Sequence, residues 1–309
     1  MTARNATTRL LVTGASGALG QALLHGAVAR GVAVAGLARG PVDGLPEGGV
    51  HLRADLLAPG GPPDLAALAP THLIHAAWVT EHPGYWTSPR NHDWQAASLA
   101  LLERFAAAGG RHLTFVGTCA EYDWTRPARA GDAPEGYPLT LYGASKLLTT
   151  QMLMRRAAEL GVGFTCARLF MPYGAGENPA RVTTLTVDAL LAGRDLHLRA
   201  GDVLRDIAST PGIARAVLGL TLAGREGVHD IATGQATHLG GFLRETIGAM
   251  LGGAERITWD PYDAAVEDPA RNPRVLLGDA SLLPEELRPP VVDAAALEAL
   301  VARRRALRA

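Results

Sequence analysis

Residues 10–24 read "LLVTGASGALGQALL", an apolar strand pattern that runs through a turn of small residues directly into a helix pattern. Small residues let backbone N–H groups approach a phosphate, and the N-terminus of a helix favours its negative charge. This order near the start of the chain predicts a site for the pyrophosphate of a dinucleotide. The alternative is a tight turn that needs glycine for its own backbone. The predicted cofactor contacts in this turn are Gly14, Ser16, Gly17, Ala18 and Leu19.

The pattern that continues from this turn predicts the fold class. Short apolar runs rich in Val, Leu, Ile and Phe recur along the first half, and longer amphipathic stretches separate several of them. This alternation predicts an α/β fold, a Rossmann-type doubly wound parallel sheet covered on both faces. The predicted strands are 9–14, 31–38, 49–56, 71–77, 111–117 and 162–170, and the predicted helices between them are 18–30, 93–108 and 140–160.

The pattern of predicted strands and helices changes in the second half of the chain. Pro- and Gly-rich stretches separate helical segments at 182–192 and 239–251. The change predicts two domains. The first, 1–170, is a dinucleotide-binding Rossmann domain with a return segment near 200–235, and the second, 171–309, is a smaller and irregular substrate-binding domain.

Composition narrows the class of protein. The 309 residues are 48% hydrophobic and 19% charged, as expected of a soluble globular protein. The net charge of −1 and the mixed signs predict neither a nucleic-acid partner nor binding to a membrane surface. The two cysteines have no metal-ligand spacing, which fits a reducing compartment and no bound metal. Without a secretory pattern or a long apolar run, the expected location is the cytoplasm.

The end of the second predicted strand indicates which dinucleotide binds. A carboxylate there usually accepts a hydrogen bond from the ribose of NAD. This sequence has Ala38 at that place, followed by Arg39. An arginine pairs with a 2′-phosphate through charge-assisted hydrogen bonds, so NADP is the predicted cofactor and NAD the alternative. A solvated Arg39 in a loop is the other interpretation of the same residue.

A second motif, "YGASK" at 142–146, contains the only lysine among 29 lysines and arginines. Tyr142 and Lys146 are four residues apart, so on a helix they lie on one side, a turn apart. A nearby ammonium stabilises a phenolate and lowers the pKa of the tyrosine toward neutral pH. A lysine also donates from a compact charge to ribose hydroxyls where a guanidinium fork would not fit. The pair predicts acid–base chemistry beside a nicotinamide, and a surface lysine is the alternative.

With these motifs in place, the chain resembles the extended short-chain dehydrogenases/reductases, in particular the NAD(P)-dependent nucleotide-sugar epimerase/dehydratase family. The resemblance is carried in family order by "TGASGALG" at 13–20, "ADL" at 54–56, "IHAA" at 74–77, "GTCAEYD" at 117–123, "YGASK" at 142–146, "RLFMPYG" at 168–174, "LRDIAST" at 204–210 and "GVHDIATGQAT" at 227–237.

The resemblance implies roles for individual residues. Tyr142 would exchange a proton with the sugar oxygen, and Thr118 would hydrogen-bond the same oxygen. Lys146 would lower the pKa of Tyr142 and hold the nicotinamide ribose. It also implies a nucleotide-sugar substrate and a homodimer formed through the helices at 93–108 and 140–160. The further cofactor contacts implied are Asp55 and Leu56 at the adenine, Ala76 and Ala77 along the phosphates, and Phe170 near the nicotinamide. The predicted substrate contacts are Trp86, Cys119, Met171, Arg181 and Arg205.

Departures from the family pattern bear on the reaction. Sugar dehydratases of the family have Asp-Glu after the threonine, where this chain has Cys119 and Ala120. The 3,5-epimerising relatives have a cysteine base at the slot that Ala120 fills, so Cys119 is one residue too early. Met171 replaces a frequent Asn. Neither elimination of water nor a cysteine base is therefore expected.

The stretch 78–94 holds three of the five tryptophans, together with Tyr85. It follows the fourth predicted strand, beside which the family binds its sugar. We interpret it as an aromatic-lined substrate lid that includes Trp86, with Trp124 opposite. The alternative is a loop that packs its own aromatic side chains.

Three functions are compatible with these residues. The main hypothesis is an NADPH-dependent reductase of a keto-sugar nucleotide, with a 4-keto-6-deoxy sugar as the expected substrate. The alternative is a nucleotide-sugar 4-epimerase that recycles its NAD(P). A third hypothesis is a non-catalytic NADP-binding sensor on the same fold, although such proteins lose the Tyr or the Lys that this chain keeps.

Overall fold

A seven-stranded sheet organises the first part of the chain. The computed structural model describes residues 8–81, 83–125 and 138–308, which form two compact units. In the first unit the strands follow the order β3-β2-β1-β4-β5-β6-β11, and the pairs β1–β2, β1–β4, β2–β3 and β4–β5 are parallel. The strands are β1 (Arg9–Thr13), β2 (Ala33–Ala38), β3 (Val50–Arg53), β4 (His72–His75), β5 (His112–Thr118), β6 (Gly163–Leu169) and β11 (Gly227–Ile231).

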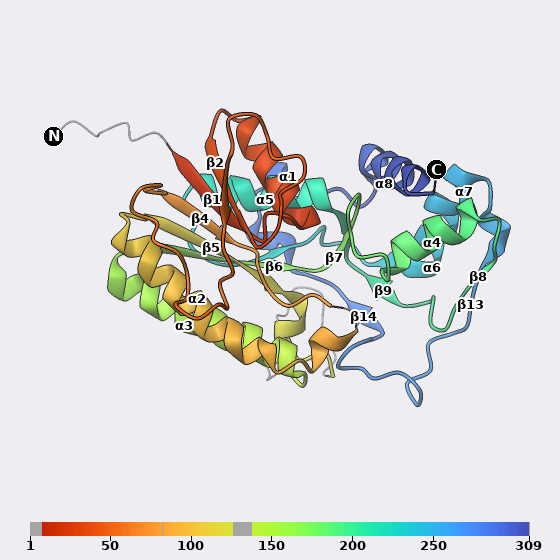
Figure 1. Ribbon diagram of the computed structural model, residues 1–309. Coiled ribbons are helices and arrows are strands. Elements are labelled where there is room, and N and C mark those ends of the chain that lie inside the picture. The colour runs from red at the N-terminus through yellow and green to blue at the C-terminus, as the bar shows by residue number, and fades with distance from the viewer. Residues whose placement is uncertain (1–7, 82, 126–137, 309) are drawn as a thin grey trace. The chain divides into compact units, whose positions relative to one another are not determined.

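Helices cover both faces of this sheet, with α1 and α5 on one face and α2 and α3 on the other (Figure 1). The central strands bury apolar side chains toward both layers, as Leu10, Leu11 and Val12 of β1 show by being almost fully buried. An ion pair between Arg156 and Glu103, 2.6 Å apart, links α3 to α2. The helices are α1 (Ala18–Val28), α2 (Arg90–Ala107), α3 (Leu141–Leu160) and α5 (Thr210–Leu222), with the short 3-10 turn η1 (Gly84–Trp86) before α2.

The second unit consists of short strands around a separate core. The strands pair as β10–β7, β12–β9–β14 and β13–β8. Tyr173, Val187, Phe242 and Leu297 are among the buried side chains of this core. The strands are β7 (Met171–Tyr173), β8 (Leu196–Leu198), β9 (Leu204–Arg205), β10 (Ile207–Ser209), β12 (Thr237–His238), β13 (Ile257–Trp259) and β14 (Val275–Leu276).

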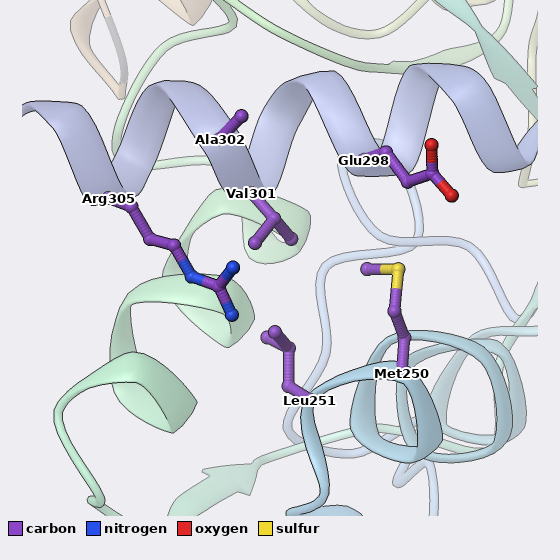
Figure 2. A pocket seen from close by; sticks show the side chains of 6 residues that line it. All are labelled: Met250, Leu251, Glu298, Val301, Ala302 and Arg305. Atoms are coloured by element: carbon purple, nitrogen blue, oxygen red, sulfur yellow. The ribbon is translucent and has the colours of Figure 1, made fainter.

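The helices of the second unit surround this core. The C-terminal helix α8 is held to α4 by Arg304, which donates to Asp188. A pocket of about 200 Å³ lies between α7 and α8, lined by apolar side chains and by Glu298 and Arg305 (Figure 2). The helices are α4 (Val182–Leu191), α6 (Leu239–Gly241), α7 (Ala249–Leu251) and α8 (Ala294–Ala306), with the π-helical η3 (Phe242–Gly248) and the 3-10 turns η2 (Cys119–Glu121), η4 (Ala254–Arg256), η5 (Ala280–Leu282) and η6 (Glu285–Leu287).

The predicted Rossmann-type sheet is confirmed, and each predicted strand falls on an observed one. The predicted helix 239–251 is helical throughout, but its central part winds as the π-helix η3. None of the helices in the described residues is long and apolar enough to cross a membrane.

The structure divides the chain between residues 168 and 169, close to the expected boundary at residue 170, but differs from the expected division in the described residues of 118–144. The first unit contains the described residues of 1–117, 145–168 and 214–229, and the rest belongs to the second. The segment that follows β5 therefore belongs to the second unit. Contacts of this segment fit the grouping, because Tyr122 donates to the Asp230 carboxylate at 2.8 Å and Trp124 meets Phe170 edge to face.

Candidate active site

The glycine turn after β1 is built for a close backbone approach. Gly14 has a φ of +69°, in the left-handed region that favours glycine. A Cβ there would lie 3.0 Å from the amide nitrogen of Ala77 and 3.1 Å from the carbonyl carbon of Ala76. Ala77 in turn donates its N–H to the Thr13 hydroxyl at 3.1 Å. The structure thus brings together the predicted phosphate contacts after β1 and after β4.

The N-terminus of α1 has the features that an anion needs. The helix begins after Gly17, no side chain caps it, and its first turn has no acidic residue. Ser16 and Gly17 are exposed, while Ala18 and Leu19 are half-buried. Uncovered N–H groups at a helix N-terminus suit a pyrophosphate. The residues present therefore fit a dinucleotide, and they would hold its phosphates.

The edge of the sheet at β2 and β3 carries positive charge. Arg39 is exposed directly after β2, and Arg53 ends β3, in register with Ala38. The guanidinium of Arg53 donates to the carbonyl oxygen of Arg39 at 3.1 Å, which places both arginines at one edge. Arg53 was missed in the sequence, where the only available signal was its place at the end of the neighbouring strand.

The predicted adenine contacts follow β3. The Asp55 carboxylate accepts the N–H of Leu57 at 3.0 Å and so closes a turn. Leu56, between them, is 3% exposed and contributes to the core. Because Asp55 is bonded within its own turn, its position is fixed by the backbone that follows β3.

Lys146 is buried in the first unit, with 4% of its surface exposed. Its ammonium donates to the carbonyl oxygen of Val116 at 2.6 Å. The same nitrogen lies 4.2 Å from the centre of the Trp78 ring and 4.1 Å from that of Phe115. The alternative of a surface lysine is thereby excluded.

A neutral histidine lies between the glycine turn and α2. The His75 ring bonds the Thr13 hydroxyl at 2.7 Å through Nδ1 and the Ser98 hydroxyl at 2.9 Å through Nε2. Burial, assisted by the positive charge of Lys146, lowers the pKa of His75 to about 3. His75 therefore links β4 to β1 and α2 as an uncharged hydrogen-bonding group.

Tyr142 and Thr118 lie on adjacent backbone segments of the second unit. Tyr142 is half-buried in the first turn of α3, next to Gly143, which packs against Ala120. Thr118 ends β5 and is 9% exposed, and its hydroxyl accepts the N–H of Ala120 at 3.2 Å. Tyr142 and Lys146 both lie in α3, four residues apart, so they share one side of that helix.

The residues between Thr118 and Tyr122 offer no further acid or base. The Glu121 carboxylate is buried and accepts the Thr118 N–H at 2.9 Å, which makes it part of a capping box. Cys119 is only partly buried as a residue, yet burial around its thiol raises the pKa to about 12. A thiol with that pKa is not a base at neutral pH.

Two predicted substrate contacts act on this segment. The positive charges of Arg181 and Arg205 each act to lower the pKa of Cys119, against the larger effect of burial. Arg181 immediately precedes α4, whose first turn is tied to the Glu177 carboxylate by the hydroxyls of Thr183 and Thr184.

Arg205 is held by its neighbours and is 5% exposed. Its guanidinium donates to the carbonyl oxygen of Leu204 at 2.9 Å and to the side-chain oxygen of Asn272. Asn272 donates in turn to the Glu267 carboxylate at 2.7 Å. Burial lowers the pKa of Arg205 to about 10, so the group stays charged at neutral pH. Asn272 and Glu267, neither of which the sequence pointed to, fix this cation in place.

The remaining predicted contacts pack into the interior of the second unit or onto its core. Phe170 is 5% exposed and meets Trp124 edge to face, with ring centres 6.2 Å apart. Trp124 also donates its indole N–H to the Cys119 carbonyl oxygen at 2.7 Å. Met171 begins β7 and lies half-buried against the core.

The described residues of the aromatic stretch 78–94 belong to the first unit, and several of their rings pack on one another. Trp78 stacks on Trp94 at 5.8 Å between ring centres, and Trp86 stacks on Tyr85 at 4.7 Å. Trp86 is half-buried. These contacts favour the alternative of a loop that packs its own aromatics, and substrate binding by Trp86 stays a prediction.

Taken together, the sheet, the uncapped glycine turn and the Tyr–Lys helix define an NAD(P)-dependent enzyme of the short-chain dehydrogenase/reductase class. A family model supports this assignment, since that of the NAD-dependent epimerase/dehydratase family matches residues 10–232. The chain belongs to this family. No curated protein matches the chain in sequence.

Solved structures share the fold over nearly the whole chain. A UDP-glucose 4-epimerase from Thermotoga maritima, solved with UDP-glucose, is 21% identical with a TM-score of 0.78, over 98% of this chain and 100% of that one. A UDP-N-acetylglucosamine 4-epimerase from Methanobrevibacter ruminantium is 19% identical with a TM-score of 0.80, over 97% and 99%. A UDP-glucose 4-epimerase from Thermus thermophilus, in complex with NAD, is 23% identical with a TM-score of 0.77, over 96% and 99%.

Proposed function

We propose that this chain is a nucleotide-sugar 4-epimerase that keeps its nicotinamide dinucleotide through the catalytic cycle. The observation that carries the proposal is the segment Thr118–Glu121, which supplies one hydroxyl and no thiolate or available carboxylate. Proton exchange is then assigned to Tyr142, and a segment 118–121 without an available acid or base suits hydride transfer at one carbon better than elimination of water. The names of the similar structures, UDP-sugar 4-epimerases, support this reading better than a keto-sugar reductase.

In this proposal each residue acts on the sugar oxygen or holds the substrate. Tyr142 accepts the proton of the 4-hydroxyl and later returns it to the carbonyl oxygen, while Thr118 hydrogen-bonds the same oxygen. Lys146 stabilises the Tyr142 phenolate. Arg205 and Arg181 bind the diphosphate of the nucleotide sugar through charge-assisted hydrogen bonds. The nicotinamide, when bound, supplies the site that accepts and returns hydride.

The proposal predicts turnover without net use of cofactor. Incubation with UDP-glucose or UDP-N-acetylglucosamine should give the 4-epimer, detected by chromatography of the products, with no net change in reduced-cofactor absorbance. UDP-sugars that carry other groups at C2 and C6 should be tested as substrates in the same assay. Stoichiometric oxidation of NADPH by a 4-keto-6-deoxy sugar nucleotide, with no conversion of the non-keto sugars, would overturn the proposal in favour of a reductase.

The reductase remains the second candidate because of one observation. Arg39 and Arg53 lie at the edge where the adenosine ribose of a dinucleotide would bind, and Ala38 stands where NAD-binding relatives have an acid. We infer from these arginines that the cofactor is NADP(H). A preference for NADPH would suit net reduction of a sugar, although it is equally compatible with an epimerase that regenerates its cofactor in each turnover.

Substitution of Arg39 tests the cofactor preference. We expect Arg39→Ala to raise the Kd for NADPH by about tenfold, the size of one lost charge-assisted hydrogen bond, and to leave the Kd for NADH unchanged. Fluorescence titration of both dinucleotides measures it. Arg30→Ala is the matched control, since Arg30 is an exposed arginine just after α1 whose guanidinium donates to the carbonyl oxygen of Gly26 in that helix. Equal affinity of the parent chain for NADH and NADPH would contradict the inference.

A further inference from the structure

The surroundings of Lys146 are unusual for a cation. Two aromatic faces, those of Trp78 and Phe115, lie 4.2 Å and 4.1 Å from the ammonium, well inside the range of about 6 Å over which a ring attracts a cation. The Val116 carbonyl accepts a hydrogen bond of 2.6 Å from the same nitrogen. All three partners belong to the first unit, and Phe115 and Val116 are consecutive in β5. The ammonium is therefore surrounded by groups that each attract positive charge.

The Trp78 ring is fixed by a network of its own. Its indole N–H donates to the side-chain oxygen of Asn91 at 2.8 Å. Asn91 is fully buried, and its amide nitrogen donates at 2.8 Å to the carbonyl oxygens of both Tyr85 and Ser88. On its other side, Trp78 stacks on Trp94. The loop before α2 thus determines where this ring lies.

The Phe115 ring is also fixed by its neighbours. Phe115 is fully buried in the centre of the sheet and meets the edge of Trp78 at 5.9 Å between ring centres. It also lies 5.7 Å from the His75 ring, which stays uncharged and so adds no repulsion toward the ammonium. The two rings form a rigid pair, because neither can move without displacing buried neighbours.

We propose that Trp78 and Phe115 are positioning residues, which hold the Lys146 ammonium in an aromatic cage one helical turn from Tyr142. The inference rests on the proposed function, since positioning matters for catalysis only if Tyr142 exchanges protons. It gives the stretch 78–94 a role other than that of a lid, namely to fix the Trp78 ring through Asn91.

The cage also explains why this position is a lysine in a chain that otherwise uses arginine. A lysine stem has several rotatable bonds, so a free ammonium would occupy many places. Two ring faces and one carbonyl oxygen confine a compact ammonium to a single place. A planar guanidinium is wider and presents its donors in one plane, so it would not fit between these rings while reaching Val116.

The single lysine allows a direct spectroscopic test. Labelling with lysine that carries ¹³C at the ε carbon gives one side-chain signal from the whole chain. In the cage the ε protons lie over two rings, so we expect the signal well upfield of free lysine. Trp78→Leu should move it toward the free position, and Trp78→Phe, which restores a ring face, should keep most of the shift. A wild-type signal at the free-lysine position would overturn the cage.

Kinetics test the positioning role separately. Trp78→Leu is expected to lower kcat by about tenfold, the size of one lost cation–π contact, with KM for the sugar nucleotide changed by less than about twofold. Trp78→Phe should recover most of kcat. Phe105→Leu is the control for loss of a buried ring, because Phe105 is fully buried in α2 and is neither of the two rings over Lys146 described above. A wild-type kcat in Trp78→Leu would overturn the positioning role.

A second variant covers the case in which Trp78→Leu does not fold. Phe115→Leu removes the other face and should give the same shift of the lysine signal and the same loss of kcat. Failure of the proposed function would look different. It would appear as an absence of epimerisation by the parent chain, while the upfield lysine signal would still show the cage.

Discussion

Replacement of Tyr142 by Phe is expected to lower kcat by about 10³-fold while leaving the free energy of unfolding almost unchanged. General acid–base catalysis by a positioned group contributes about 10² to 10⁴ in rate, and Tyr142 is the residue to which the proposed function assigns this proton exchange. Its side chain is half-buried at the start of α3, so the loss of one hydroxyl costs little stability. Steady-state rates and urea unfolding of the same preparation measure both quantities.

Tyr173→Phe is the matched control, with the opposite result expected. The Tyr173 hydroxyl accepts the N–H of Asp293 at 2.8 Å in the buried core of the second unit. Its removal leaves the half-buried Asp293 N–H without that acceptor, which costs about 1 kcal/mol of stability and should not change the chemistry. A Tyr142→Phe variant that retains a tenth or more of the parent kcat would contradict the assignment of Tyr142 as the proton-exchanging group.

Local patterns were sufficient to predict the sheet and the glycine turn. The turn after β1 is specified by residues that are close in sequence, since a Cβ at Gly20 would lie 2.2 Å from the carbonyl oxygen of Gly14. The same holds for the Tyr142–Lys146 spacing, which a helix fixes by itself. Such features depend on neighbours within one or two turns, so a single sequence reveals them.

The environment of each functional group depends on residues that are distant in sequence. Lys146 meets side chains from the loop before α2 and from β5, and Arg205 meets Asn272 from the loop before β14. No local pattern in the sequence indicates that these positions are in contact. The stretch 78–94 illustrates the consequence, because its composition left a lid and a self-packing loop open, and only the structure shows that Asn91 and Trp94 contact Trp78. The grouping of the described residues of 118–144 with the second unit has the same origin, since Tyr122 meets Asp230 and Trp124 meets Phe170.

Acidification should destabilise the first unit through His75. Burial holds its pKa at about 3 in the folded chain, against about 6.5 in the unfolded chain, so between these values the unfolded chain binds the proton. The stability that the neutral ring provides is complete above pH 6.5 and is lost as the pH falls toward 3. Between pH 7 and pH 4 the loss from this one group is about 3 kcal/mol.

Urea unfolding of the parent chain and of His75→Gln at pH 7 and pH 4 tests this predicted loss of stability. Glutamine is chosen because it keeps a donor and an acceptor but does not titrate. His112, whose pKa burial lowers to about 4, contributes to the acid sensitivity of both chains, so the difference between them isolates His75. We expect the variant to lose about 3 kcal/mol less than the parent between the two pH values. His92→Gln, at an exposed histidine of α2, is the control and should leave the parent's pH dependence unchanged. An equal loss in the parent and in His75→Gln would mean that the ring between Thr13 and Ser98 is not held neutral, and the link between the glycine turn and α2 would then have to be assigned to other contacts.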